Sequence, residues 1–286
     1  METDKEEVMN TKYIFLDVDG TLINYDAKLP DSAVEAIKKA QANGHKVLPL
    51  TGRSKAEMYD YILDIGFDGY IGGNGSYIEF ENEIILHETL ALEEEKEIVD
   101  WLQDRKLEFY LESYSGLYAS RDFKERGRDP ILEASESRNE GNGKEFTVDD
   151  AFPDMIYGAD LYREDIAKIS FILDSYDDYL AAKEKFTHLK VGTWGGVGEK
   201  ALFGDVGIKD ITKATAVELF LERTEADRKN TFAFGDAKID NSMLEFCEVG
   251  VAMGSGGEST KAIADYVTDT VDKDGLKKAF EHFGLI

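Results

Sequence analysis

The first apolar run of the chain, residues 13–16, is followed at once by two acidic residues and a turn. Its Tyr-Ile-Phe-Leu sequence is typical of a buried strand, and the glycine and threonine after the acids indicate the strand's end. Residues i and i+2 of an extended chain point the same way, so Asp17 and Asp19 are expected to face one cavity. Two carboxylates held that close require a cation or a shared proton.

Strand-like and helix-like patterns alternate through residue 73. We expect a helix at 31–43, a strand at 45–53, a helix at 54–66 and a strand at 69–73. This order predicts a parallel sheet with right-handed crossovers, in which ligands bind beyond the carboxyl ends of the strands. The residues expected around that crevice are Asp17, Asp19, Thr51, Gly52, Arg53 and Asn74.

The same alternation returns near the end of the chain, with a helix expected at 212–223 and strands at 231–236 and 248–253. Residues between these two parts mix short paired strands with separate helices, which is typical of an α+β unit with its own core. We therefore predict an α/β protein whose parallel-sheet core comprises residues 1–85 and 204–286. An α+β domain of residues 86–203 interrupts that core.

Three polar segments are interpreted without a functional role. A helix is expected at 91–105, and we interpret its acidic run as a solvated face that comprises Glu93, Glu94, Glu95 and Glu97. The first ten residues lack apolar periodicity, and residues 134–144 form a polar stretch rich in glycine, asparagine and serine. We expect no packed core element from the first ten residues.

Charge and composition narrow the choice of partners. The formal net charge of −26 argues against nucleic acid and anionic membranes, because its long-range field repels polyanions. A small phosphate ester remains compatible if local cations and a metal reverse that field. The single cysteine, Cys247, excludes an intrachain disulfide and fits a reducing compartment. With no long apolar run and no leader pattern, we expect a cytoplasmic protein that is a monomer or small homo-oligomer.

Three further segments carry groups that phosphoryl transfer needs. Thr51 ends a strand, so its hydroxyl and the following amides can hold phosphoryl oxygens, with Arg53 nearby. Lys213 lies in the first turn of a helix, where the dipole disfavours a cation, and this position indicates a nearby anion. Asp236 ends an apolar strand and Asp240 follows one turn later. With Asp17 and Asp19 they predict an oxygen-rich Mg²⁺ site, although an Asp-x-Asp pair alone would equally suit Mn²⁺ with a nucleotide sugar.

These four segments, in this order, resemble the motifs of the haloacid dehalogenase superfamily, and within it the Cof-like sugar-phosphate phosphatases. The matching segments are Asp17–Leu22, Thr51, Lys213 and Gly235–Asp240, and the Asn-Gly pair at Asn74 resembles the segment before the family's cap. The resemblance implies a Rossmann-like core with a large inserted cap for substrate specificity. The chain departs from the family pattern at Ile239, where the family has asparagine. Asn241 is the residue expected to replace that contact.

The resemblance also implies a mechanism. Asp17 would attack phosphorus to form an aspartyl phosphate, and Asp19 would act as the general acid and base. Mg²⁺ would be held by Asp17, the Asp19 carbonyl and Asp236, while Thr51 and Lys213 clamp the phosphoryl group. Asp240 would orient Lys213 or a metal-bound water. The predicted partner is a small phosphate ester, and the substrate contacts are assigned to Gly52, Arg53, Asn74 and Asn241.

Two alternatives to the phosphatase remain open from the sequence. A hexose phosphomutase with the same architecture would need several cap cations for a second phosphate, and Arg121, Lys124, Arg126 and Arg128 cluster in sequence. Acidic residues alternate with these cations, which is typical of a solvated loop instead. A non-catalytic protein that binds a phosphate ligand is the other alternative, and Ile239 is its support.

Overall fold

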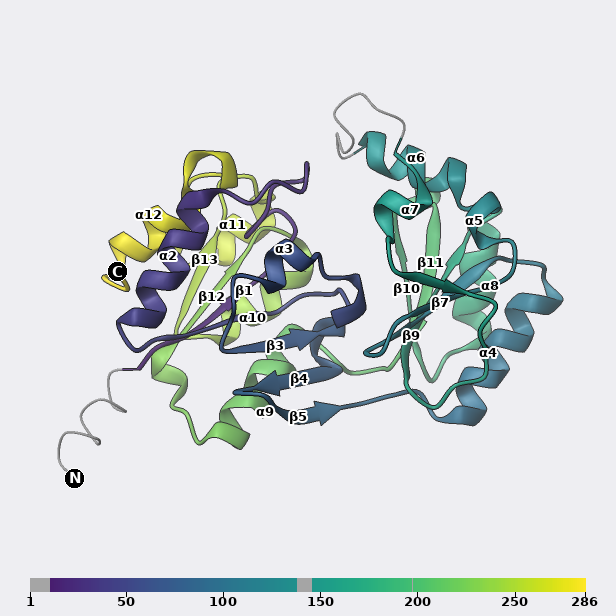
Figure 1. The fold of residues 1–286 in the computed structure, drawn as a ribbon, viewed down its shortest axis with the longest axis horizontal. Helices are drawn as coiled ribbons and strands as arrows, with labels where there is room; N and C mark the ends of the chain where they lie inside the picture. The colour runs from purple at the N-terminus through teal and green to yellow at the C-terminus, as the bar shows by residue number, and fades with distance from the viewer. Residues whose placement is uncertain (1–10, 138–145, 197) are drawn as a thin grey trace. The chain divides into compact units, whose positions relative to one another are not determined.

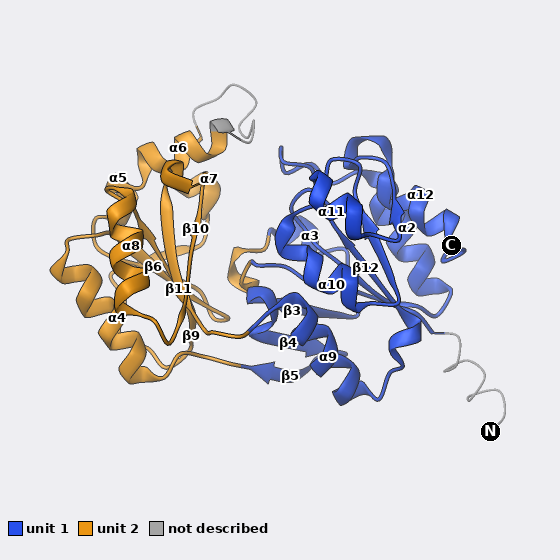
Figure 2. Ribbon diagram, turned by 180° about the vertical axis from the view of Figure 1, so that it is seen from behind, with its two compact units in different colours: residues 1–52, 59–87, 211–286 blue, residues 53–58, 88–210 orange. Residues whose placement is uncertain are grey.

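A computed structural model describes residues 11–137, 146–196 and 198–286 (Figure 1). The expectations for the first ten residues and for most of the 134–144 stretch lie outside these described residues. The chain forms two compact units (Figure 2), the first of residues 1–52, 59–87 and 211–286 and the second of residues 53–58 and 88–210. The second unit thus takes in a short segment, residues 53–58, that the sequence assigned to the core.

The first unit is built on a parallel sheet of five strands. Their order is β14 (Tyr266–Val267), β13 (Val249–Ala252), β12 (Thr231–Gly235), β1 (Tyr13–Leu16) and β2 (Lys46–Pro49). In the register, Phe15 of β1 lies beside Ala233 of β12 and Leu48 of β2. Both faces of β1 are buried, which explains its uninterrupted apolar sequence. The predicted parallel α/β core is confirmed.

Helices cover the sheet, and aromatic residues of its neighbouring strands β1 and β12 contact different helices. Phe15 packs with Phe220 of α9 (Lys213–Thr224), whereas Phe234 packs with Phe280 of α12 (Gly275–His282). The remaining helical elements of this unit are α2 (Asp31–Ala42), α3 (Asp60–Leu63), α10 (Asn241–Phe246), α11 (Glu258–Ile263), η2 (Gly73–Gly75), η4 (Arg228–Asn230), η5 (Lys238–Asp240) and η6 (Val271–Lys273). The chain therefore buries both sheet faces, and the polar strand ends are left to form a site.

The prediction that the strand at 69–73 joins the parallel sheet is wrong. Strand β3 (Gly69–Gly72) pairs antiparallel with β4 (Tyr77–Phe80), which pairs antiparallel with β5 (Glu83–His87). An isolated parallel bridge joins Leu50 to Ile71. The reason is the reversal at η2, where three consecutive residues have φ values of 56°, 57° and 121°. Gly75 must lack a side chain there, because a Cβ would lie 2.6 Å from Ala216 Cβ.

The helix predicted over 54–66 is also wrong. The structure has a short 3₁₀ turn, η1 (Lys55–Glu57), and then the four-residue α3, separated by extended backbone at Met58 and Tyr59. The apolar residues of segment 54–66 are spaced as in a helix, but only Met58, Ile62 and Ile65 of this segment are buried. Tertiary packing therefore overrides the local pattern.

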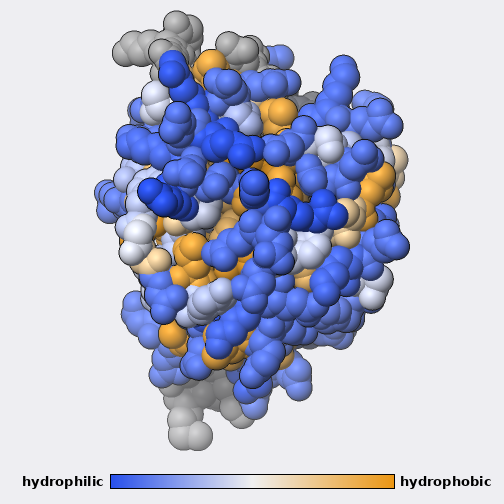
Figure 3. All heavy atoms as spheres, turned by 90° about the vertical axis from the view of Figure 1, so that its right-hand side faces the viewer, coloured by the Kyte–Doolittle hydropathy of each residue, from blue (hydrophilic) through white to orange (hydrophobic). Residues whose placement is uncertain are grey.

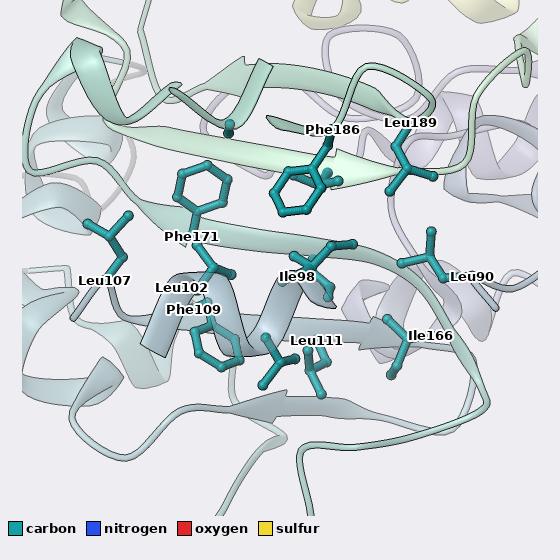
Figure 4. Packing of buried hydrophobic residues seen from close by; sticks show 14 of the residues in the cluster. Leu90, Ile98, Leu102, Leu107, Phe109, Leu111, Ile166, Phe171, Phe186 and Leu189 are labelled. Carbon is teal, nitrogen blue, oxygen red and sulfur yellow. The ribbon is translucent and has the colours of Figure 1, made fainter. Parts of the chain in front are cut away.

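The second unit contains a six-stranded sheet with its own core. The strand order is β10 (Lys190–Trp194), β11 (Phe203–Gly207), β9 (Ile166–Ile172), β6 (Phe109–Ser113), β7 (Leu117–Ala119) and β8 (Met155–Tyr157). All pairs are antiparallel except β7 with β8. Its helical elements, besides η1, are α4 (Leu92–Asp104), α5 (Phe123–Arg126), α6 (Arg128–Ser137), α7 (Val148–Ala151), α8 (Tyr176–Lys185) and η3 (Gly198–Lys200). Figure 4 shows the buried side chains of this core, among them Ile98 and Leu102 of α4 and Phe171 of β9.

Hydrophilic residues cover most of the face of the molecule that is drawn in Figure 3, with hydrophobic residues in small groups between them.

One residue of the acidic run on α4 is not solvated. Glu93 and Glu97 are exposed as expected, but Glu95 is 0% exposed and neither carboxylate oxygen has a hydrogen-bond partner among the described residues. The interpretation of Glu95 is wrong because it lies one turn before Ile98 and Val99, on the helix face that packs on the sheet. Burial raises the pKa of Glu95 from 4.5 to about 7.

Replacing Glu95 by glutamine is expected to stabilise the protein above neutral pH. Between the ordinary pKa of 4.5 and the folded-state value of about 7, the unfolded chain loses its proton while the folded chain keeps it. The folded state therefore loses stability as the pH rises through this window. Urea unfolding should give Glu95→Gln a gain of about 3 kcal/mol at pH 8 relative to its difference from the parent at pH 4.5. The exposed Glu93→Gln is the control, and an equal pH response of both variants would contradict the assignment.

No helix within the described ranges is long and apolar enough to cross a membrane.

Candidate active site

Two acidic residues meet at the carboxyl edge of the parallel sheet. Asp17 directly follows β1, and Asp236 directly follows β12, its neighbour in the sheet. The amide of Asp17 donates a 3.0 Å hydrogen bond to the Phe234 carbonyl, which continues the pairing past the last strand residue. Asp240 joins them from η5, and one carboxylate oxygen from each of the three lies within 4.8 Å of the others. All three side chains are buried.

A buried lysine connects this cluster to helix α9. Thr212 caps the helix by accepting a hydrogen bond from the Thr215 amide, which places Lys213 as the first helical residue. The Lys213 side chain is 1% exposed, and its Nζ donates to Asp17 Oδ1 and to Asp240 Oδ1, both at 2.6 Å. The anion expected near Lys213 from its unfavourable helix position is therefore this pair of carboxylates.

The cluster changes the acidity of its members. Burial opposes the charge of Lys213, but Asp17 and Asp240 outweigh it and raise the pKa of the ammonium. Burial, assisted by the charge of Asp240 and opposed by Lys213, raises the pKa of Asp17 well above its usual range. Burial likewise raises the pKa of Asp236 to about 6, against the hydrogen bond from Tyr25. The site thus carries more carboxylates than its one lysine neutralises, and a further cation would relieve that excess.

Both carboxylate oxygens of Asp240 are engaged by the protein. Oδ1 accepts from Lys213, and Oδ2 accepts from the backbone amides of Asp236 and Ala237 at 3.0 and 2.9 Å. The two backbone hydrogen bonds hold the start of the loop after β12. Gly235 leaves room for the Asp240 side chain, because a Cβ on Gly235 would lie 2.4 Å from the Asp240 Cβ. The geometry therefore suits Asp240 for orienting Lys213 and the Asp236 backbone.

Asp17 and Asp236 fit a site for a hard divalent cation. Asp236 Oδ1 is buried without a hydrogen-bond partner among the described residues, so it is available as a ligand. The backbone makes room for this carboxylate at Gly20, where φ is +84° and a Cβ would lie 2.2 Å from Asp236 Oδ2. Asp19 is partly buried and close enough for its charge to raise the pKa of Asp17 and of Asp236. Carboxylate oxygens are the ligands that Mg²⁺ prefers.

Four further predicted residues lie in the same unit. Thr51 is buried just beyond β2, and its backbone bonds to the Ile71 carbonyl and the Asn74 amide at 3.0 and 2.8 Å. A Cβ on Gly52 would lie 3.3 Å from Asn74 Oδ1, so these two residues are adjacent. Asn241 is the first residue of α10. The side-chain oxygens of Asn74 and Asn241 are buried without hydrogen-bond partners among the described residues.

Two other residues discussed from the sequence have different surroundings. Arg53 belongs to the second unit, where its Nη1 donates to the Glu57 carbonyl at 3.1 Å, and its role in the site stays a prediction. Ile239 is 51% exposed, so its side chain is not part of the buried cluster around Asp240.

Sequence reasoning missed one residue at the site. The Tyr25 hydroxyl donates a 2.6 Å hydrogen bond to Asp236 Oδ2, although the two residues are 211 positions apart. Tyr25 lies in a polar turn without apolar periodicity, so no spacing signal pointed to it. Its position in the segment directly after the Asp17–Leu22 motif is the one feature of the sequence that could have drawn attention to it.

The buried carboxylates of Asp17, Asp236 and Asp240 gather at the carboxyl edge of the parallel sheet, together with the buried ammonium of Lys213 from α9, and such a set of groups is suited to phosphoryl chemistry. The family model of haloacid dehalogenase-like hydrolases matches residues 14–280. The chain belongs to this family, which confirms the resemblance drawn from the sequence.

Several relatives are phosphatases by name. A putative phosphatase of Bacillus subtilis, YkrA, is 28% identical over 289 residues, covering 97% of this chain and 100% of that protein. A second Bacillus subtilis protein, the 5-amino-6-(5-phospho-D-ribitylamino)uracil phosphatase YcsE, is 25% identical and covers 100% of both chains. Among solved structures, the sugar phosphatase BT4131 of subclass IIB has a TM-score of 0.73 and 26% identity, over 96% of this chain and 100% of that one. The chain is thus a phosphatase-type enzyme, and the comparisons favour this over the non-catalytic alternative.

Proposed function

We propose that this chain is a Mg²⁺-dependent phosphatase that hydrolyses small phosphorylated metabolites, sugar phosphates in particular, through an aspartyl phosphate on Asp17. The observation that carries the proposal is the Lys213 ammonium held between Asp17 and Asp240, beside the free oxygen of Asp236. The name of BT4131, a sugar phosphatase, and that of YcsE, whose substrate is a phosphorylated ribityl compound, support the substrate class.

The proposed reaction has two displacements at phosphorus. In the first, an Asp17 oxygen forms a bond to phosphorus while the ester P–O bond breaks, and Asp19 gives its proton to the leaving alkoxide. In the second, Asp19 takes a proton from water, the water oxygen bonds to phosphorus, and the Asp17–phosphorus bond breaks to release inorganic phosphate. Over the cycle Asp19 gives one proton to the alcohol and takes one from water, and Asp17 is released as a carboxylate, so the enzyme returns to its starting state.

The other residues bind and orient. We assign to Lys213 and the Thr51 hydroxyl the role of holding oxygens of the transferring group, and to Asp240, which accepts from Lys213, the role of directing the ammonium. The buried amides of Asn74 and Asn241 offer further polar contacts with substrate. Mg²⁺, when held by Asp17, the Asp19 carbonyl and Asp236, would supply positive charge that keeps Asp17 ionised and stabilises the transferring group.

We assign substrate selection to the second unit, whose bounds approximate the insert predicted at 86–203. One face of its sheet carries polar groups: Glu112 accepts hydrogen bonds from Lys168 at 2.8 Å and Ser170 at 2.6 Å. Asp205 lies beside Ser170 in the register, on the same face. Burial raises the pKa of Glu112 to about 8 and also raises the pKa of Asp205. Such groups suit hydroxyls, which both donate and accept hydrogen bonds.

The phosphomutase alternative has less support from the structure. Of the four clustered cations it would use, Lys124 pairs with Asp149 at 2.7 Å and Arg126 pairs with Asp174 at 2.5 Å. These are exposed ion pairs on the surface of the second unit, which favours the solvated-loop interpretation. In the presence of the sugar bisphosphate as primer, a mutase would convert a sugar 1-phosphate to its isomer without releasing phosphate.

Phosphate release tests the proposal. The purified chain should hydrolyse p-nitrophenyl phosphate with Mg²⁺, lose this activity in excess EDTA and regain it when Mg²⁺ is restored. A panel of sugar phosphates, nucleotides and pyridoxal phosphate should then rank sugar phosphates highest in kcat/KM. Hydrolysis that is insensitive to EDTA would contradict the metal, and isomerised sugar phosphate without free phosphate would favour the mutase.

A further inference from the structure

Tyr25 contacts the proposed metal site without belonging to any of the four motifs. Its hydroxyl donates to Asp236 Oδ2 at 2.6 Å, from a side chain that is 43% exposed. The bond therefore connects a partly exposed ring to a buried carboxylate at the carboxyl end of β12. Lys213 donates its hydrogen bonds to Asp17 and Asp240. Among the described residues, the side-chain hydrogen bond that the Asp236 carboxylate accepts comes from Tyr25.

The turn that carries Tyr25 is held in place on both sides. Asn24 Oδ1 accepts hydrogen bonds from the amides of Asp26 and Lys28 at 3.0 and 2.9 Å, which closes the turn. Asn24 Nδ2 donates to Asp272 at 2.7 Å, and the Tyr61 hydroxyl donates to the Ala27 carbonyl at 2.7 Å. These contacts tie the turn to η6 and α3 of the same unit. The position of the Tyr25 ring is thus specified by the fold.

The two oxygens of Asp236 have different surroundings. Oδ2 is fixed by Tyr25, whereas Oδ1 is buried without a partner in the described structure. The tyrosine hydrogen bond opposes rotation of the carboxylate about its Cβ–Cγ bond and thereby fixes the orientation of the group. One oxygen is consequently held back while the other is kept available.

We propose that Tyr25 is a positioning residue that orients the Asp236 carboxylate so that Oδ1 is presented to a divalent cation. This inference rests on the proposed Mg²⁺ dependence and adds to it a residue outside the motifs. Metal-binding carboxylates are commonly held by outer hydrogen bonds, and loss of such a bond typically costs about 10–100-fold in metal affinity.

Metal binding without turnover tests the inference. Tyr25→Phe removes the hydroxyl and keeps the ring, so the fold should be retained. Mg²⁺ is titrated into each protein without substrate, and the rise in Tm is used to obtain the dissociation constant. Mn²⁺ binding, followed by electron paramagnetic resonance, gives an independent value. We expect the dissociation constant for both ions to rise about tenfold or more in Tyr25→Phe.

Tyr162→Phe is a closely matched control. Tyr162 is also 43% exposed, and its hydroxyl also donates to an aspartate, Asp100, at 2.6 Å, but it lies in the second unit. This variant should bind both ions as the parent does. Equal affinities of Tyr25→Phe and the parent would overturn the inference, and tighter binding would do so too, because the hydroxyl would then compete with the ion. If the parent itself binds neither ion, the proposed metal dependence fails instead.

Discussion

Replacing Asp17 by asparagine is expected to abolish phosphate release, with a fall in kcat of about 10⁴-fold or more. The asparagine amide has the same shape as the carboxylate but is a far weaker nucleophile, so no aspartyl phosphate can form. Asp240 cannot substitute, because its two oxygens are bound to Lys213 and to two backbone amides. Release of phosphate from p-nitrophenyl phosphate with Mg²⁺ measures the effect.

The control for this variant is Asp64→Asn. Asp64 is an exposed residue at the end of α3 in the same unit, so the substitution makes an equal change in charge. It should leave kcat and KM unchanged. Retention of more than about a tenth of the parent's kcat in Asp17→Asn, with normal folding, would refute the assignment of the nucleophile.

Replacing Lys213 by methionine is expected to cost both activity and about 3–5 kcal/mol of stability. Methionine fills the space of the lysine stem but leaves Asp17 and Asp240 as buried carboxylates without their shared cation. The effect should be measured by urea unfolding in EDTA, so that no metal compensates for the lost charge. Because the pKa of Lys213 is raised in the folded protein, the stability that its charge contributes is fully present below the unfolded-state pKa. This stability is lost as the pH rises through the folded-state value.

A surface lysine and a double variant separate the buried interaction from a general effect of charge. Lys278 pairs with Asp269 at 2.5 Å, but both side chains are about half exposed, and Lys278→Met should leave the stability nearly unchanged. The double variant Lys213→Met with Asp17→Asn should be less destabilised than the sum of the single variants, since it removes one uncompensated carboxylate. Strict additivity would contradict the ion pair as the source of the loss.

The sequence predicted the strand ends well because their chemistry is local. An apolar run such as 13–16 predicts a buried parallel strand, and the acid that follows it must then lie at the carboxyl edge of the sheet. The same reasoning applies to Asp236, and the structure brings both residues together with Lys213 and Asp240. The α/β fold and the family are confirmed, while the catalytic roles of these residues remain predictions.

The features that the sequence did not predict depend on tertiary contacts. The reversal at η2, which makes β3 antiparallel to β4, depends on three residues with positive φ and on close approach to Ala216. Glu95 is buried because of where α4 packs, and an acidic run contains no information about that contact. Tyr25 meets Asp236 across 211 residues through a turn that Asn24 and Tyr61 hold in place.

Trapping the phosphorylated enzyme tests the central claim most directly. In Asp19→Asn, p-nitrophenyl phosphate supplies a leaving group that needs no proton, while the second displacement lacks its general base, so the aspartyl phosphate should accumulate. Quenching with sodium borohydride reduces an acyl phosphate to the alcohol, and mass spectrometry of the peptides locates the product. We predict homoserine at position 17, dependent on both substrate and Mg²⁺. A reduced residue elsewhere, or release of p-nitrophenol with position 17 unmodified, would contradict the account.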